Sequence, residues 1–203
     1  MRPIVQRLIA YPMVGFMTFV IGHGLAIKKN VENQHVTFDL PTLNQEKSGM
    51  DDFVNSLEYQ EQKRCMALNM YFEARNEDTD DAMIAVGYTV LNRVESERYP
   101  DTICDVVFQA RRDSHGNPIR NKCQFSWACD GKSDEVDTDN VLERKAWERA
   151  VTLAEQVMER KVDNPIGNAT MYHATYVRPY WRRAYTQVAK VESHIFYQQR
   201  SRG

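Results

Sequence analysis

Residues 65–77 read CMALNMYFEARNE, an apolar stretch that ends in a cluster of charged residues. Leu68 and Phe72 lie four residues apart, which is the spacing of the apolar face of a helix. The charged residues that follow do not continue this pattern. We therefore expect a helix that begins near residue 58 and ends at Ala74.

Glu73 stands at the end of this predicted helix. A carboxyl group beside Tyr71 and Phe72 is partly removed from water, which raises its pKa toward the range of a general acid. The structural alternative is a solvated glutamate that pairs with Arg75 or with the N-terminus of a downstream helix. Aromatic segments farther along the chain favour the catalytic interpretation.

Three further helices are predicted, each preceded by a residue that can cap it. The second begins after Asp78 or Thr79 and ends before Tyr99, the short third follows Thr102, and the long fourth follows Asn140. The predicted helices therefore occupy mainly the first three quarters of the domain.

The remaining stretches do not have helical spacing. Residues 111–131 are rich in Gly, Pro, Asn and Asp, which predicts a loop. Residues 169–175 and 188–197 are rich in β-branched and aromatic residues, which predicts two or three short antiparallel strands. The fold class is therefore α+β, mainly helical with a small antiparallel sheet.

Three segments, 123–131, 172–181 and 193–197, place aromatic rings beside amide, hydroxyl and imidazole groups. Sugar rings pack on aromatic faces while their hydroxyl and acetamido groups need hydrogen-bond partners, so this composition suits a saccharide groove. The alternative is that the aromatic residues form the core of the sheet and that His173 is structural. The candidate substrate-binding residues are Gln124, Ser126, Tyr172, His173, Tyr176, Trp181 and His194.

The N-terminal span 8–27 contains no Asp, Glu, Lys or Arg and is long enough to cross a bilayer as a helix. We expect residues 1–27 to be a signal peptide or signal anchor, residues 28–57 a polar spacer, and residues 58–203 the functional domain. The alternative is a buried core helix. Export to the periplasm or cell envelope follows, with an initial tether to the inner membrane through residues 8–27.

Four cysteines in an exported chain permit two disulfides in any of three connectivities. We expect at least one, involving Cys104 or Cys129, because both flank the segments assigned to the groove. A zinc site is disfavoured, since neither C-x₂-C nor H-x₃₋₅-H spacing occurs. The sequence therefore predicts no metal and no cofactor.

The charge pattern bears on partners. The 203 residues carry a net charge of −2, which argues against a nucleic-acid partner. Residues 160–203 nevertheless hold eight basic and two acidic residues, so this end of the chain suits an anionic polymer or a membrane surface. No obligate protein partner is predicted.

The chain resembles the SleB-type cell wall hydrolase family over about two thirds of its length. The resemblance rests on six blocks: ALNMYFEARNE (67–77), AVGYTVLNRV (85–94), YPDTICDVVFQ (99–109), QFSWACDG (124–131), YHATYVRPYW (172–181) and SHIFY (193–197). It implies a lysozyme-like, lytic-transglycosylase-like domain that acts on peptidoglycan glycan strands, with Glu73 as the single catalytic acid and base. Asn76 departs from the glycine common in relatives. The peptidoglycan-binding module of the spore enzymes is replaced by the membrane segment, as in a phage signal-anchor endolysin or a bacterial envelope-remodelling enzyme.

The number of carboxylates separates the mechanisms. A hydrolytic muramidase needs a second carboxyl group beside the bond, and the choices are Glu77, Asp80, Asp81 and Asp130. A lytic transglycosylase needs only one, and we favour it, with Arg75, Glu77 and Asp130 as neighbours that orient the site. Two different functions compete with glycan cleavage: that of a non-catalytic, membrane-anchored peptidoglycan-binding protein and that of a zinc-dependent amidase or peptidase.

Overall fold

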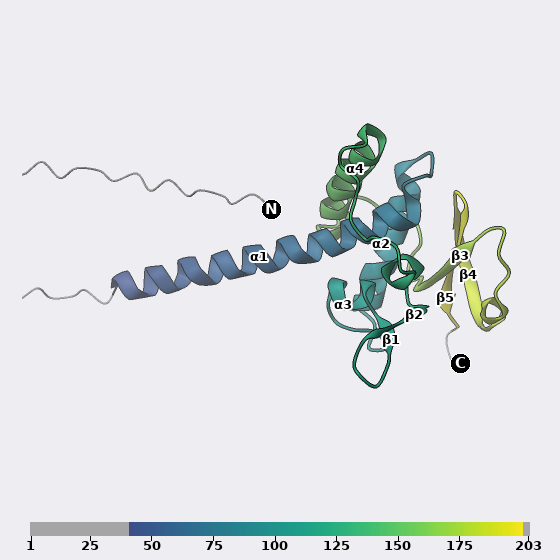
Figure 1. Ribbon diagram of the computed structural model, residues 1–203, viewed down its shortest axis with the longest axis horizontal. Coiled ribbons are helices and arrows are strands. Elements are labelled where there is room, and N and C mark those ends of the chain that lie inside the picture. Colours follow the sequence, from purple (N-terminus) through teal and green to yellow (C-terminus); the bar gives the residue numbers. More distant parts are fainter. Residues whose placement is uncertain (1–40, 201–203) are drawn as a thin grey trace, which may run out of the picture. The chain divides into compact units, whose positions relative to one another are not determined.

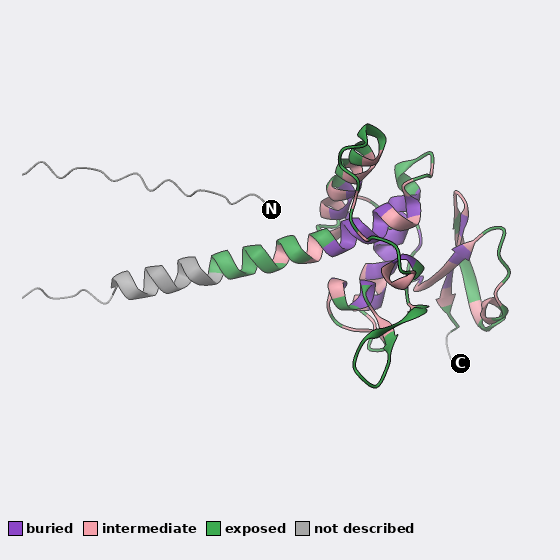
Figure 2. Cartoon of the chain, in the orientation of Figure 1, coloured by how far each residue is buried: buried purple, intermediate pink, exposed green. Residues whose placement is uncertain are grey.

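The computed structural model describes residues 41–200, and their side chains from residue 52 onward. Its main helices are α1 (Pro41–Ala74), α2 (Asp80–Val94) and α4 (Val141–Met158). The C-terminal part of α1 packs against both α2 and α4 (Figure 1). Figure 2 shows the buried residues gathered around this junction. The predicted combination of helices with small antiparallel sheets is confirmed.

Close packing between the helices fixes the last turns of α1. Met70, Val86 and Val157 are fully buried. A Cβ atom at Gly87 would lie 3.2 Å from Cγ1 of Val157 and 3.3 Å from Sδ of Met70, so a larger residue at this position would require these two side chains to shift. Burial of a valine or methionine side chain stabilises the fold by about 1.5 to 3 kcal/mol. The helical turn that carries Glu73 is thus fixed by close packing against α2 and α4.

The predicted starts of the three later helices are confirmed. Thr102 caps α3 (Ile103–Val107) by accepting a hydrogen bond from the Asp105 backbone N–H at 3.1 Å. Asn140 caps α4 by accepting hydrogen bonds from two backbone N–H groups of its first turn. Thr79 precedes α2 but makes no capping bond, and its hydroxyl donates to Glu192, 2.6 Å away.

The C-terminal region forms a three-stranded antiparallel sheet in the order β3-β5-β4. The strands are β3 (Met171–Ala174), β4 (Tyr185–Val191) and β5 (His194–Gln199), and the 3-10 helix η2 (Tyr180–Ala184) precedes β4. The register places Tyr172 opposite Phe196 and His173 opposite Ile195. Phe196 is fully buried, so the central strand attaches the sheet to the core. The predicted strands are confirmed. The second predicted stretch, residues 188–197, contains the end of β4, the turn that follows it and the start of β5.

The prediction of a loop over residues 111–131 is wrong in part. This region contains most of the hairpin formed by β1 (Ala110–Arg112) and β2 (Pro118–Cys123), followed by the 3-10 helix η1 (Ser126–Cys129). Residues 111–122 are all exposed, so neither face of the hairpin has an apolar pattern that the sequence could reveal.

The predicted disulfides are present. Cys65 of α1 is bonded to Cys104 of α3, and Cys123 of β2 is bonded to Cys129 of η1. The first bridge ties two helices of the core together. The second ties the end of the exposed hairpin to η1. Residues of η1 lie near Glu73.

Helix α1 begins well before the expected position near residue 58. The stretch 41–57, assigned to the spacer, is helical, and residues 52–58 are exposed. Met50, Phe53, Val54 and Leu57 have the i, i+3, i+4, i+7 spacing of a helix, so the sequence did carry a signal for part of this stretch. Pro41, Ser48 and Gly49 are typical of breaks in regular structure, which favoured the assignment to a spacer. Residues 8–27 and 28–40 lie outside the described residues. Among helices of the described part, none is both long and apolar enough to span a membrane.

Candidate active site

A cleft of about 470 Å³ lies between the C-terminal end of α1, η1 and the three-stranded sheet. It brings together Glu73 and all seven residues that the sequence singled out for substrate binding. The lining residues are Phe72, Glu73, Arg93, Gln124, Phe125, Ser126, Trp127, Met171, Tyr172, His173, Ala174, Tyr176, Trp181 and His194. Segments separated by more than one hundred residues in the chain therefore meet at one cavity.

Glu73 is held by a hydrogen bond from the opposite wall. The Tyr172 hydroxyl donates to Oε2 of Glu73 at 2.7 Å. Burial raises the pKa of Glu73 above its ordinary value, while this hydrogen bond and the positive charge of Arg93 act in the opposite direction. Because the effect of burial is the largest, the carboxyl group keeps its proton to higher pH than an ordinary glutamate does.

Tyr172 is suited to remain a donor. Burial, followed by the negative charge of Glu73, raises the pKa of Tyr172 well above its ordinary value of 10. Its ring also lies 5.4 Å from the rings of both His194 and Phe196, which fixes the direction of the hydroxyl. The phenol therefore stays protonated and aimed at the carboxyl group.

Arg93 is a site residue that the sequence reasoning missed. Its side chain is almost fully buried, and its Nε donates to the Thr170 carbonyl at 2.8 Å. The guanidinium lies 4.9 Å from the Phe125 ring, and Nη1 has no hydrogen-bond partner among the described residues. A signal existed, since Arg93 follows Val86 by seven residues and so lies on the apolar face of α2.

On the sheet side of the cleft, aromatic side chains contact one another in a defined arrangement. Nδ1 of His173 lies 2.8 Å from the Ala174 carbonyl, which can only accept, so Nδ1 carries the proton. Nε2 of the same ring lies 3.0 Å from the Tyr197 hydroxyl, within hydrogen-bond distance. Trp181 packs edge-on against His173, with ring centroids 5.6 Å apart. Tyr176 is 86% exposed, so its ring is free to contact a ligand.

The opposite side combines exposed polar residues with a buried aromatic floor. Gln124 and Ser126 are exposed at the cleft. Phe72 stacks on Trp127 with ring centroids 4.7 Å apart, and Nε1 of Trp127 donates to the buried Asn69 side chain at 3.1 Å. Polar groups for recognition thus stand beside an apolar surface that excludes water.

The three residues expected to orient the site have different positions. Glu77 accepts a hydrogen bond from Ser193, and its Oε1 lies 3.9 Å from Nδ1 of His194, so it contacts a cleft residue. Burial lowers the pKa of His194, with Glu77 acting in the opposite direction. Arg75 lies outside the cleft lining, and its guanidinium stands over aromatic rings of α1. Asp130 also lies outside the lining, 3.8 Å from Nζ of Lys132.

The chemistry available in the cleft depends on its carboxylates. Among the described residues that line it, Glu73 is the one carboxylate. No group of three or more His, Cys, Asp and Glu residues within residues 41–200 has the arrangement of a metal site. All four cysteines are in disulfides, so none offers a thiolate.

Comparison with known proteins identifies the family of the chain. The sequence pattern of the cell wall hydrolase family matches residues 77–197. The chain belongs to this family. The structure of this cell wall hydrolase is similar to the catalytic domain of SleB from Bacillus cereus, with 22% identity, a TM-score of 0.45, and coverage of 68% of this chain and 91% of that domain. It is also similar to the catalytic domain of the germination-specific lytic transglycosylase SleB from Bacillus anthracis, with 24% identity, a TM-score of 0.45 and coverage of 68% and 94%. A search of curated proteins finds no match.

Membership of the family makes the chain a peptidoglycan-cleaving enzyme. The matched region includes Arg93 and the seven predicted substrate-binding residues. It begins at Glu77, four residues after Glu73, so the assignment of the catalytic acid depends on the geometry of the cleft.

Proposed function

We propose that this enzyme cleaves the bond between N-acetylmuramic acid and N-acetylglucosamine by lytic transglycosylation, with Glu73 as its single acid and base. The proposal is supported by one observation above all: Glu73 is the one carboxylate among the described residues of the cleft lining. Hydrolysis by the common two-carboxylate routes needs a second group beside the bond. Transglycosylation needs none, because the substrate supplies the nucleophile.

In the first step, protonated Glu73 gives its proton to the glycosidic oxygen as the bond from that oxygen to C1 of the muramic sugar breaks. The carboxylate then accepts the proton of the C6 hydroxyl of the same sugar. O6 attacks C1 and closes a 1,6-anhydro ring. Glu73 ends protonated as it began, and the proximity of O6 to C1 replaces the positioning of a water molecule.

Two neighbours of Glu73 assist this cycle. Since the Tyr172 hydroxyl donates to Oε2, the acidic proton resides on Oε1. After the proton leaves, the same hydrogen bond and the nearby charge of Arg93 stabilise the carboxylate. The cleft therefore supports both the acid form and the base form of one residue, which general acid–base catalysis requires.

The aromatic residues of the sheet side position the sugars. Tyr176 and Trp181 offer faces or edges for packing against apolar sides of sugar rings. Gln124, Ser126 and His194 offer donors and acceptors for hydroxyl and acetamido groups.

Product analysis tests the proposal. Purified enzyme should clear a cell-wall zymogram and release 1,6-anhydro products, about 18 Da lighter than those of a hydrolytic muramidase because no water is added. Products with reducing ends would overturn the transglycosylase assignment.

Two variants of the same residue type form a matched pair. Glu73→Gln keeps the shape but cannot exchange the proton, so activity should fall by a factor on the order of 10² or more. Glu77→Gln should lose markedly less, because Glu77 contacts Ser193 and His194 and does not line the cleft. A fully active Glu73→Gln enzyme would overturn the site.

The proposal includes export, with residues 8–27 as signal anchor or cleaved signal peptide. The substitutions Val14→Lys and Val20→Lys would interrupt the uncharged span and should make the free energy of membrane insertion less favourable by several kcal/mol. Cell fractionation should then find the variant in the cytosol. Unchanged export of the variant would show that this span is not the export signal.

A further inference from the structure

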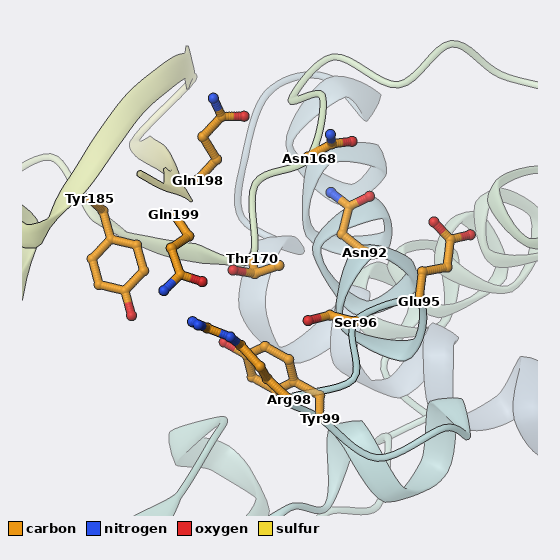
Figure 3. Close-up of a pocket in the computed structure, with 10 residues that line it drawn as sticks. All are labelled: Asn92, Glu95, Ser96, Arg98, Tyr99, Asn168, Thr170, Tyr185, Gln198 and Gln199. Carbon is orange, nitrogen blue, oxygen red and sulfur yellow. The ribbon is translucent and has the colours of Figure 1, made fainter. Parts of the chain in front are cut away.

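A second hollow, of about 550 Å³, lies beside the catalytic cleft and has a different character. Its lining contains amides, hydroxyls, a guanidinium and one carboxylate but no aliphatic side chain. The lining residues are Asn92, Glu95, Ser96, Arg98, Tyr99, Asn168, Thr170, Tyr185, Gln198 and Gln199. Figure 3 shows the ends of Arg98, Gln199 and Tyr185 pointing toward a common space.

A third hollow, of about 320 Å³, connects this one to the catalytic cleft. It shares Tyr99 with the second hollow and Gln124 with the cleft around Glu73. Arg111 and Lys122 of the exposed hairpin also line it. The three hollows thus adjoin one another in a row, with the cleft of Glu73 at one end.

The part of the row outside the catalytic cleft is cationic. Arg98, Arg111 and Lys122 are exposed, and none has a carboxylate within 4 Å among the described residues. The one carboxylate that lines these two hollows, Glu95, is paired with Arg160. Three positive charges therefore remain available to a ligand.

This chemistry differs from that of the sugar-binding part of the cleft. Asparagine and glutamine side chains match the N–H and C=O groups of a peptide backbone, since each amide offers both a donor and an acceptor. Lysine and arginine match carboxylates. Peptidoglycan carries both groups on one chain, because short acidic peptides are attached to its muramic acid residues.

We infer that the row of hollows from Gln124 to Gln199 binds the acidic stem peptide of the glycan strand. The inference rests on the proposed function, since the peptide enters the row when its muramic acid lies at Glu73. Arg98, Arg111 and Lys122 contact the peptide carboxylates. The enzyme therefore selects peptide-bearing strands over strands from which the peptides have been removed.

Binding tests this inference without any cleavage step. The full chain carrying Glu73→Gln is titrated with soluble glycan strands of one length, either bearing stem peptides or stripped of them by an amidase. The peptide-bearing strands should bind about tenfold more tightly, a difference expected for a few exposed charge pairs. The difference should shrink as salt is added. Equal binding of the two strands would overturn the inference.

Substitutions assign the difference to the three cations. Arg98→Gln, Arg111→Gln and Lys122→Gln together should abolish the preference, whereas Arg98→Lys with Arg111→Lys should keep it and so exclude misfolding as the cause. Lys190→Gln removes an exposed charge on β4 outside the row and should have no effect. A preference that survives the triple glutamine variant would overturn the inference. Anhydro products would be unaffected by that result, so the proposed mechanism is judged separately.

Discussion

Replacing Tyr172 by phenylalanine tests the link between the two walls of the cleft. The change removes one hydroxyl, which donates to Oε2 of Glu73 at 2.7 Å. This hydrogen bond lowers the pKa of Glu73 against the larger, raising effect of burial. Without it, the Glu73 carboxyl should keep its proton to higher pH, because the charged form loses a donor.

The size of the effect follows from the charge of the acceptor. A hydrogen bond to a charged group contributes roughly 1.5 to 3 kcal/mol. We take the lower end of this range, since the cleft admits water that can replace the hydroxyl in part. At 1.36 kcal/mol per pH unit, the pH at which kcat/KM falls to half on the alkaline side should rise by about one unit. The same loss should slow proton donation about tenfold at the optimum, because the carboxylate that forms is less stabilised.

A pH–rate profile on soluble glycan strands measures both effects. Tyr88→Phe serves as the control, since the Tyr88 hydroxyl donates to the Val162 carbonyl and Tyr88 does not line the cleft. The control should lose thermal stability and keep the alkaline limb of the wild type. If the alkaline limb of Tyr172→Phe coincides with that of the wild type, Tyr172 does not control the proton of Glu73.

Two further predictions concern stability. Burial raises the pKa of Glu73, so its contribution to folding is complete below the ordinary glutamate range and is lost as the pH rises through the folded-state pKa. Glu73→Gln should therefore melt at a higher temperature than the wild type at pH 7. The difference in melting temperature should vanish at about pH 4. Thermal melts that show the same difference at both pH values would contradict this prediction. Loop entropy predicts that replacing Cys65 and Cys104 by serine, 39 residues apart, lowers the free energy of unfolding by about 4 kcal/mol, against about 2 kcal/mol for Cys123 and Cys129, six residues apart. Urea unfolding measures both values, and the reverse order would refute the entropic account.

Local signals in the sequence predicted the helices well. Thr102 and Asn140 each precede a helix and accept backbone hydrogen bonds there, as their residue types indicate. The β1–β2 hairpin escaped prediction because residues 111–122 are exposed on both faces. The start of α1 at Pro41 escaped because Pro41, Ser48 and Gly49 are typical of breaks in a helix, although Met50, Phe53, Val54 and Leu57 have helical spacing.

The candidate site was predictable in its membership more than in its contacts. Aromatic and polar composition singled out Tyr172 and His173, and the structure brings both to the cleft of Glu73. Spacing along the chain could not reveal that the Tyr172 hydroxyl binds Glu73, because that contact depends on how the sheet packs against α1. Arg93 was missed because attention to the valine spacing of α2 passed over a charged residue on the same face.

The pairing of Glu73 with Tyr172 has a consequence for the timing of synthesis. The two residues are 99 positions apart, and the rest of the sheet follows Tyr172. A ribosome adds roughly 5 to 20 residues per second, so the glutamate is made roughly 5 to 20 s before the hydroxyl that binds it. A nascent chain, or one whose translation stops early, holds the glutamate without the second wall of the cleft. If Glu73 acts as proposed, the lytic activity therefore begins only when the last strand is complete.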